Sequence, residues 1–265
     1  MATAASILDD LVAEQHALDA IVSDLTDEQW STPTASERWS VSDQIGHLAF
    51  FDQTAAWAIA DEDAFRASLD GLAAVFAPDA GPETMDELTL GAYRAMSPAE
   101  LLAAWRTHRT ELATAAADLA DGARIIWYGP SMGAKSFLTA RLMECWAHGQ
   151  HVVDALDVHR SSTDRLEHIV RLGVNTRGWT YLNRGLEAPT ADIAIALDAP
   201  SGAVWRFGPD DAEQTITGTA EDFCLVVTQC RNVSTTQLQV VGDDALDWMT
   251  KAQAFAGGAT DGPAA

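Results

Sequence analysis

The chain has 265 residues, of which 48% are hydrophobic and 21% charged. This length and composition predict two folded domains and exclude a disordered chain. Sixteen basic and 39 acidic residues give a formal net charge of −23, and such a surface repels nucleic acids and anionic lipid head groups. No apolar run approaches the ~20 residues of a membrane span. We therefore expect neither nucleic acid nor a membrane as a partner.

The cysteines and the first residues indicate the compartment. Cys145, Cys224 and Cys230 form no Cys-x-x-Cys pair, which suits a reducing environment and argues against a thiolate-rich zinc site. The N-terminus lacks the basic and apolar regions of a signal peptide. We expect a cytoplasmic protein in which histidine and carboxylate groups hold any metal. The sequence is also compatible with a homodimer.

The first part of the chain predicts four long helices, which together suggest a bundle. Apolar residues recur at spacings of three and four in the first helix. Ser40 with Asp43 predicts the start of the second helix, Ser97 with Glu100 that of the third, and Ser136 that of the fourth. The predicted helices cover residues 5–25, 41–60, 98–121 and 137–157.

The connections between these helices are less regular. Residues 30–39 contain a proline and several hydroxyl residues, and they predict a loop. Pro78, Gly81 and Pro82 interrupt helical patterns in a long crossover, in which residues 83–95 could form a short helix.

After residue 160 the pattern changes to short strands and helices. Thr219 should cap a helix, although residues 220–229 also suit a strand. The remaining elements are helices over 165–184 and 244–255, and strands over 193–197, 204–207, 215–218 and 237–241. We expect an α+β protein with a metal-binding four-helix bundle over 1–160, a smaller α/β domain over 161–256 and a flexible tail over 257–265.

One stripe of the fourth predicted helix carries the candidate chemistry. Arg141, Glu144, His148 and His151 are separated by three, four and three residues, so they share one face. Glu144 and His148 can reach the same ion, and His47 of the second helix is the natural third ligand.

Other interpretations of these residues stay open. A glutamate and a histidine at this spacing are common as a solvated pair, and His47, in an apolar helix, also suits a hydrogen-bonded core histidine. The remaining histidines lack comparable partners, and we interpret them as structural or surface residues: His16, His108, His159 and His168.

Two segments resemble known signatures. Residues 33–48, with Trp-Ser-Val-Ser-Asp-Gln-Ile-Gly-His-Leu at 39–48, and residues 141–150, with Glu-Cys-Trp-Ala-His at 144–148, look like those of DinB-like bundle proteins. Within that group they most resemble the mycothiol-dependent maleylpyruvate isomerases. Residues 165–189, 205–209 and 252–257 extend the likeness, and the carboxy-terminal part is similar in pattern to sterol-carrier-like α/β domains.

The resemblance implies a metal centre. His47, Glu144 and His148 match the divalent metal ligands of the family, usually zinc. Where many relatives carry aspartate, this chain has His151, which could be a fourth ligand, a general base or, as we favour, a residue that orients a ligand. The fourth metal position is then open to water or a thiol.

The resemblance also implies a reaction. In the isomerase, a thiol cofactor adds to a conjugated double bond, rotation follows, and loss of the thiol leaves the trans isomer. We expect a zinc- and mycothiol-dependent isomerase or S-transferase acting on a small electrophilic substrate, for which a carboxylated compound is one candidate. The alternatives are a hydrolase, hydratase or lyase that activates water, and a non-catalytic ligand-binding module.

Arginines are the candidates for binding an anionic substrate, because guanidinium binds carboxylate through paired hydrogen bonds. Arg141 lies one turn from Glu144, so it could take part in catalysis by binding substrate, or pair with Glu144. Arg94, Arg177 and Arg184 are further candidates for substrate binding, with a surface charge as the alternative for each.

Overall fold

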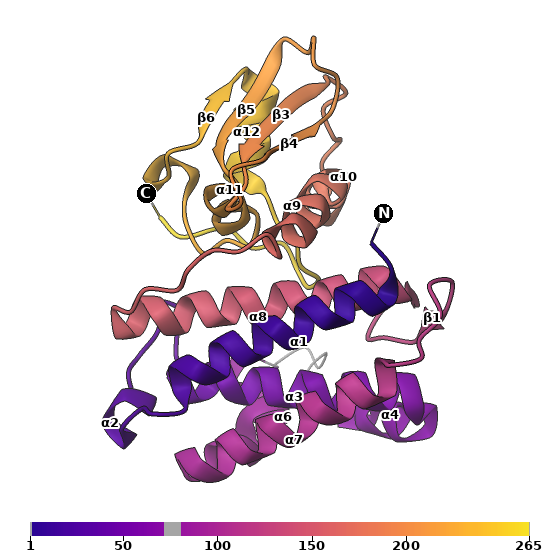
Figure 1. Ribbon diagram of the computed structural model, residues 1–265, viewed down its shortest axis with the longest axis vertical. Coiled ribbons are helices and arrows are strands. Elements are labelled where there is room, and N and C mark those ends of the chain that lie inside the picture. Colours follow the sequence, from indigo (N-terminus) through magenta and orange to yellow (C-terminus); the bar gives the residue numbers. More distant parts are fainter. Residues whose placement is uncertain (1, 72–80, 265) are drawn as a thin grey trace. The chain divides into compact units, whose positions relative to one another are not determined.

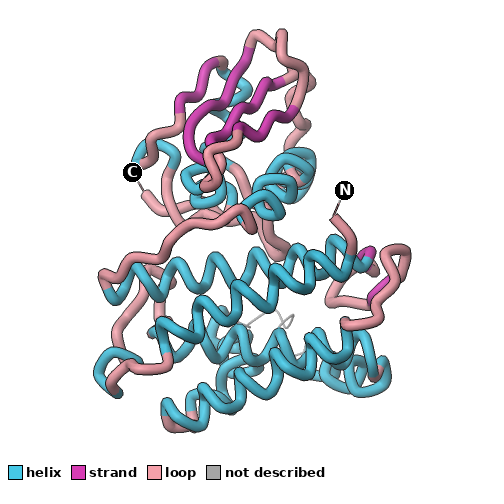
Figure 2. Tube along the Cα trace, viewed as in Figure 1, coloured by secondary structure: helices cyan, strands magenta, loops and turns pink. Residues whose placement is uncertain are grey.

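The computed structural model describes residues 2–71 and 81–264. The chain divides into two compact units, with the boundary between His159 and Arg160. Figure 2 shows that helices are the main elements of the first unit, and that the four-stranded sheet belongs to the second. The protein is therefore an α+β protein, as the sequence predicts.

Four long helices dominate the first unit, and α3 and α1 each pack against both α7 and α8. Their core includes Leu18, Ile45, Trp105 and Leu142, all fully buried. Burial of each aliphatic side chain contributes about 1.5–3 kcal/mol relative to exposure. The four helices are α1 (Ala4–Val22), α3 (Val41–Ala60), α7 (Pro98–Ala116) and α8 (Ala134–Leu156).

Two predicted helix starts are confirmed by their capping hydrogen bonds. The Asp43 backbone N–H donates to the Ser40 hydroxyl, and the Ser40 N–H donates to the Asp43 carboxylate. Ser97 and Glu100 form the same reciprocal pair at the start of α7. Each box satisfies backbone donors that a helix leaves unpaired at its first turn.

The predicted end of α7 and the predicted start of α8 are wrong. Helix α7 ends at Ala116 and does not reach residue 121, because the backbone N–H groups of Ala117 and Leu119 donate to carbonyls three residues earlier, in turns that do not continue the helix. Helix α8 begins at Ala134, before Ser136, and has no side-chain cap. The reason is that strand β2 (Met132–Gly133) pairs with β1 (Arg124–Ile125) and leads directly into the helix.

Shorter elements connect the long helices. The helix expected over 83–95 is confirmed as α6 (Pro82–Arg94), which packs on α3. The interruption expected at Pro78 lies outside the described residues. The sequence did not indicate the short strands β1 and β2, nor α2 (Asp27–Trp30), α4 (Glu62–Ser68) and the 3-10 turn η1 (Leu69–Gly71).

The second unit is built on a mixed sheet of order β4-β3-β5-β6, in which β3 and β5 are parallel and the other neighbours antiparallel. Ile193, Ile195 and Leu197 alternate with less buried residues, so they share one face. Helices α11 and α12 pack on the sheet. The elements are α9 (Leu166–Asn175), α10 (Arg177–Asn183), β3 (Ile193–Asp198), β4 (Val204–Phe207), β5 (Gln214–Thr219), α11 (Ala220–Val227), η2 (Val233–Thr235), β6 (Gln239–Val241) and α12 (Asp243–Lys251).

Most predicted elements of this unit are confirmed, with some changes. Thr219 caps α11, so the strand alternative for 220–229 is wrong. The helix expected over 165–184 breaks at Thr176 into α9 and α10, and α12 ends at Lys251. Residues 257–264 form no helix or strand, and side chains such as Asn183 and Gln253 bind their backbone.

None of the described helices has an apolar stretch long enough to cross a lipid bilayer.

Candidate metal centre

The start of α3 determines where His47 points. Because the capping box begins the helix at Val41, Gln44, His47 and Phe51 lie at spacings of three and four and therefore share one face. This helix packs against α8, which presents Glu144 and His148, four residues apart on one face. Local signals thus set the face on which each predicted ligand lies, and the packing of α3 against α8 brings the three together.

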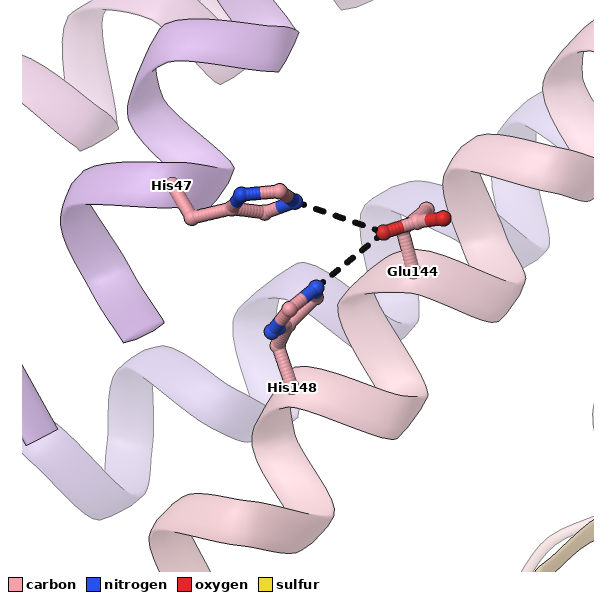
Figure 3. Close-up of side chains that lie close together, drawn as sticks. All are labelled: His47, Glu144 and His148. Carbon is pink, nitrogen blue, oxygen red and sulfur yellow. Dashed lines mark hydrogen bonds and ion pairs between the residues drawn. The ribbon is translucent and has the colours of Figure 1, made fainter. Parts of the chain in front are cut away.

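The three side chains converge on one carboxylate oxygen. His47 Nε2 lies 3.4 Å and His148 Nε2 lies 3.1 Å from Oε2 of Glu144, as Figure 3 shows. One donor atom from each residue lies within 4.8 Å of the others. Donor atoms on a tetrahedral zinc ion lie roughly 3.3–3.6 Å apart. The spacing and the donor types therefore fit a divalent metal ion.

Burial and protonation also suit a metal. The side chains of His47, Glu144 and His148 are 16%, 25% and 16% exposed, so the cluster is shielded but reachable. Burial and then the neighbouring His47 lower the pKa of His148 to about 4, although Glu144 opposes this. Burial alone would raise the pKa of Glu144, but contacts with His148 and His47 hold it well below its ordinary value. At neutral pH the cluster offers a carboxylate and a neutral His148 imidazole, which are the forms that bind metals.

Gln44 contacts the other side of the His148 ring. Its Oε1 lies 2.6 Å from His148 Nδ1, while its Nε2 donates to Oγ1 of Thr34 and Oγ of Ser36. Gln44 is completely buried. The sequence marks Gln44 only as part of a family signature, although its position three residues before His47 puts it on the same helical face.

Aromatic rings flank the two histidines. The Trp39 ring lies 5.1 Å from His47 and 5.9 Å from His148, and Phe51 lies 4.5 Å from His47, measured between ring centroids. Trp39 Nε1 donates to Asp86 Oδ1 of α6, which fixes the indole. These rings make an apolar surround, which strengthens electrostatic interactions at the centre.

Arg141 pairs with Asp52, and not with Glu144 as the helical spacing suggested. Its guanidinium forms an ion pair with Asp52 at 2.9 Å, and both side chains are almost completely buried. The proposed pairing with Glu144 is therefore wrong, because the face that Arg141 shares with Glu144 also meets α3, which supplies the Asp52 carboxylate.

His151 lies beside the candidate ligand His148, whereas Arg94 contacts the first turn of α3. The His151 ring centroid is 6.3 Å from that of His148, one turn further along α8. Arg94 donates to Asp43 at 2.7 Å and lies 3.7 Å from Asp86. Its contact with Asp43 therefore joins α6 to the first turn of α3, one turn before His47. The predicted catalytic and substrate-binding roles of His151 and Arg94 remain predictions.

Arg177 and Arg184 belong to the second unit and bind backbone carbonyls there. Arg177 donates to Ala191 and Pro189, and Arg184 donates to Lys251 and Thr260. These contacts hold both guanidinium groups against the backbone of their own unit. The predicted substrate-binding roles of Arg177 and Arg184 remain predictions.

The fold and the cluster define a two-unit α+β protein whose helical unit carries a candidate centre of two histidines and one glutamate. The chain belongs to the family described as the mycothiol maleylpyruvate isomerase N-terminal domain, whose sequence model matches residues 11–152, more than half of the chain. The resemblance of the sequence to the mycothiol-dependent maleylpyruvate isomerases is thereby confirmed.

A relative from Mycobacterium tuberculosis matches nearly the full length of the chain. An uncharacterized protein of Mycobacterium tuberculosis, Rv0036c in strain H37Rv and MT0041 in strain CDC 1551, is 44% identical over 260 residues. The match covers 97% of this chain and 98% of the relative. The relative therefore has both units.

Two crystal structures share the fold. The mycothiol-dependent maleylpyruvate isomerase is 17% identical with a TM-score of 0.56, over 91% of this chain and 95% of that one. A histidine-to-alanine variant of that enzyme is 18% identical with a TM-score of 0.54, over 85% and 91%. At this identity the likeness extends to the fold alone.

Proposed function

We propose that the protein is a metal-dependent enzyme that uses a low-molecular-weight thiol such as mycothiol to isomerise or conjugate a small electrophilic substrate. The observation that carries the proposal is the approach of His47 Nε2 and His148 Nε2 to one oxygen of Glu144. Membership of the mycothiol maleylpyruvate isomerase N-terminal family supports the choice of thiol. We further propose a DinB-like bundle over 1–160, a sterol-carrier-like domain over 161–256 and a tail over 257–265.

In this proposal, His47, Glu144 and His148 hold the metal, and zinc suits two imidazoles and a carboxylate. A bound zinc ion would supply a Lewis acid that lowers the pKa of a thiol. Glu144 offsets part of the ion's charge, and the rings of Trp39 and Phe51 limit the access of water.

The other polar residues of α8 have separate parts. Arg141 and Asp52 form an interhelical ion pair that holds the Glu144 face of α8 against α3. His151, one turn beyond His148, keeps its predicted roles: a residue that orients a ligand, which we favour, or a general base at the edge of the centre. Because Arg141 is already paired with the buried carboxylate of Asp52, its part in the site is to fix where α8 lies against α3.

Metal content tests the first part of the proposal. Full-length protein is loaded with zinc, dialysed and measured by elemental analysis, together with His47→Ala and His16→Ala. We expect one zinc per wild-type chain and per H16A chain, because His16 is exposed on α1, and none in H47A. Equal zinc in H47A and the wild type would refute the ligand assignment.

A substrate screen tests the second part. Activated alkenes and epoxides are supplied to the zinc protein with and without a low-molecular-weight thiol, and the loss of electrophile is followed. We expect loss only when zinc and thiol are both present. Turnover without thiol would favour activation of water, and zinc binding without turnover would favour a binding module.

A further inference from the structure

The His148 ring has a hydrogen-bond partner on each nitrogen. Nδ1 lies 2.6 Å from Gln44 Oε1, and Nε2 lies 3.1 Å from Glu144 Oε2. A neutral imidazole carries hydrogen on only one of its nitrogens. Which nitrogen carries it decides whether the lone pair points toward Glu144 and His47 or away from them.

The neighbours of Gln44 determine how its amide is oriented. The hydroxyl of Thr34 donates to the Trp39 carbonyl at 2.9 Å, so its single hydrogen is used and its oxygen can only accept from Gln44. The amide nitrogen of Gln44 therefore faces Thr34, at 2.8 Å, and Ser36, at 3.0 Å. The amide oxygen must then face His148, because an amide is assigned from its hydrogen-bond network.

Both facing oxygens only accept hydrogen bonds, Gln44 Oε1 at 2.6 Å from Nδ1 and Glu144 Oε2 at 3.1 Å from Nε2, so a neutral ring can donate to only one of them. The shorter contact assigns the hydrogen to Nδ1. The hydrogen then sits on Nδ1, and the lone pair of Nε2 points toward Glu144 and His47. We infer that Gln44 is a positioning residue that holds His148 in the Nδ1–H form and presents Nε2 to the metal. This inference rests on the metal centre of the proposed function.

A second glutamine on α3 makes a matched comparison. Gln53 Nε2 lies 3.0 Å from His108 Nε2, and His108 Nδ1 lies 3.1 Å from the Ala49 carbonyl. This pair includes none of the three candidate ligands. Replacing Gln53 therefore removes a glutamine–histidine contact from the same helix without touching the ligand His148.

The test has two readouts, one of which needs no metal. In metal-free full-length protein labelled with ¹⁵N-histidine, two-bond ¹H–¹⁵N spectra report which ring nitrogen carries hydrogen, and His148→Gln identifies the signals of His148. Zinc affinity is then measured by competition with a chelating indicator. The variants are Gln44→Met, which removes the acceptor, Gln44→Glu, which keeps one, and the control Gln53→Met.

We expect the Nδ1–H form in the wild type, Q44E and Q53M, and a shift toward the Nε2–H form in Q44M. Loss of a residue that orients a metal-binding histidine typically weakens metal affinity by about 10–100-fold, and we expect that loss in Q44M alone. An Nε2–H form in the wild type, or wild-type affinity in Q44M, overturns the inference.

Because Gln44 is completely buried, a loop variant provides a second test if Q44M fails to fold. Thr34→Val with Ser36→Ala removes both acceptors of the Gln44 amide nitrogen, and we expect mixed His148 forms and weaker zinc binding. No change in either readout overturns the inference. A wild-type protein that shows the Nδ1–H form but binds no zinc overturns the proposed function, and the metal-presenting role with it, while leaving the tautomer assignment intact.

Discussion

The Asp52 carboxylate connects to all four long helices, and its ion pair with Arg141 joins α3 to α8 at 2.9 Å. Its other oxygen accepts hydrogen bonds from Gln15 of α1 and Trp105 of α7. Asp52 and Arg141 are 2% and 4% exposed. Both charges are therefore removed from water, and each depends on the other for compensation.

Breaking this pair should destabilise the protein strongly. Asp52→Ala leaves the guanidinium of Arg141 buried without its carboxylate, and such a loss typically costs about 3–5 kcal/mol. Urea denaturation of the full chain measures the free energy of unfolding. Arg66→Ala, in the exposed pair with Glu62, is the control and should lose no more than about 0.5 kcal/mol. A loss below about 1 kcal/mol in D52A would contradict the structural role.

The Asp52–Arg141 pair also shows which contacts could not be predicted from the sequence. The spacing of Arg141, Glu144 and His148 correctly placed them on one face, because helical neighbours follow from the repeat. The same spacing offered Glu144 as the partner of Arg141 because it reports only neighbours within one helix. The true partner is 89 positions away on α3, and only the packing of two helices brings the groups together.

The ion pairs of Asp19 should make stability sensitive to acid. Asp19 of α1 accepts hydrogen bonds from Arg106 and Arg109 of α7. Burial alone raises the pKa of Asp19, but the two arginines outweigh this effect and place the pKa below its ordinary value of 3.8. The unfolded chain therefore takes up a proton at higher pH than the folded chain, and stability is lost as the pH falls through this range.

Comparing the wild type with Asp19→Asn isolates this contribution. The difference in unfolding free energy should be constant above about pH 5 and should shrink as the pH falls below the ordinary carboxyl range. Urea titrations between pH 3 and 7 measure it. Glu62→Gln, in an exposed pair, should give a small difference throughout. A D19N difference that does not change with pH would show that the arginines do not hold Asp19 ionised.

Gly208 should tolerate no side chain. It follows strand β4 with φ of +75°, and a Cβ atom there would lie 2.1 Å from the Ile193 carbonyl oxygen. Gly202 has a similar φ of +86° but no atom within 4 Å of a Cβ position. Gly202→Ala therefore measures the backbone strain alone, and Gly208→Ala adds a steric clash.

We expect G208A to lose about 1–3 kcal/mol more than G202A, the usual cost of overpacking. Chemical denaturation gives the total loss, and hydrogen exchange across residues 193–219 locates it in the sheet. Equal losses in the two variants would mean that Ile193 moves aside at little cost.

Predictability differed along the chain for a physical reason. The starts of α3 and α7 could be predicted because Ser40 with Asp43, and Ser97 with Glu100, act within one turn. The start of α8 could not, because it depends on the pairing of β1 with β2. The spacing of Gln44 from His47 indicates their common face, but the contact of Gln44 with the His148 ring, 104 positions away, depends on the packing of α3 against α8.

Zinc binding should stabilise the folded chain, and removal of zinc should reverse the effect. A ligand at 100 times its dissociation constant adds about 2.7 kcal/mol when it binds only the folded state. In Glu144→Gln the neutral amide replaces the only carboxylate of the three-residue cluster, so we expect little or no stabilisation. Glu111→Gln, which changes an exposed glutamate of α7, should respond as the wild type does. Thermal unfolding with added zinc and then with excess chelator measures each shift, and an equal rise in E144Q and the wild type would place the bound zinc elsewhere in the chain.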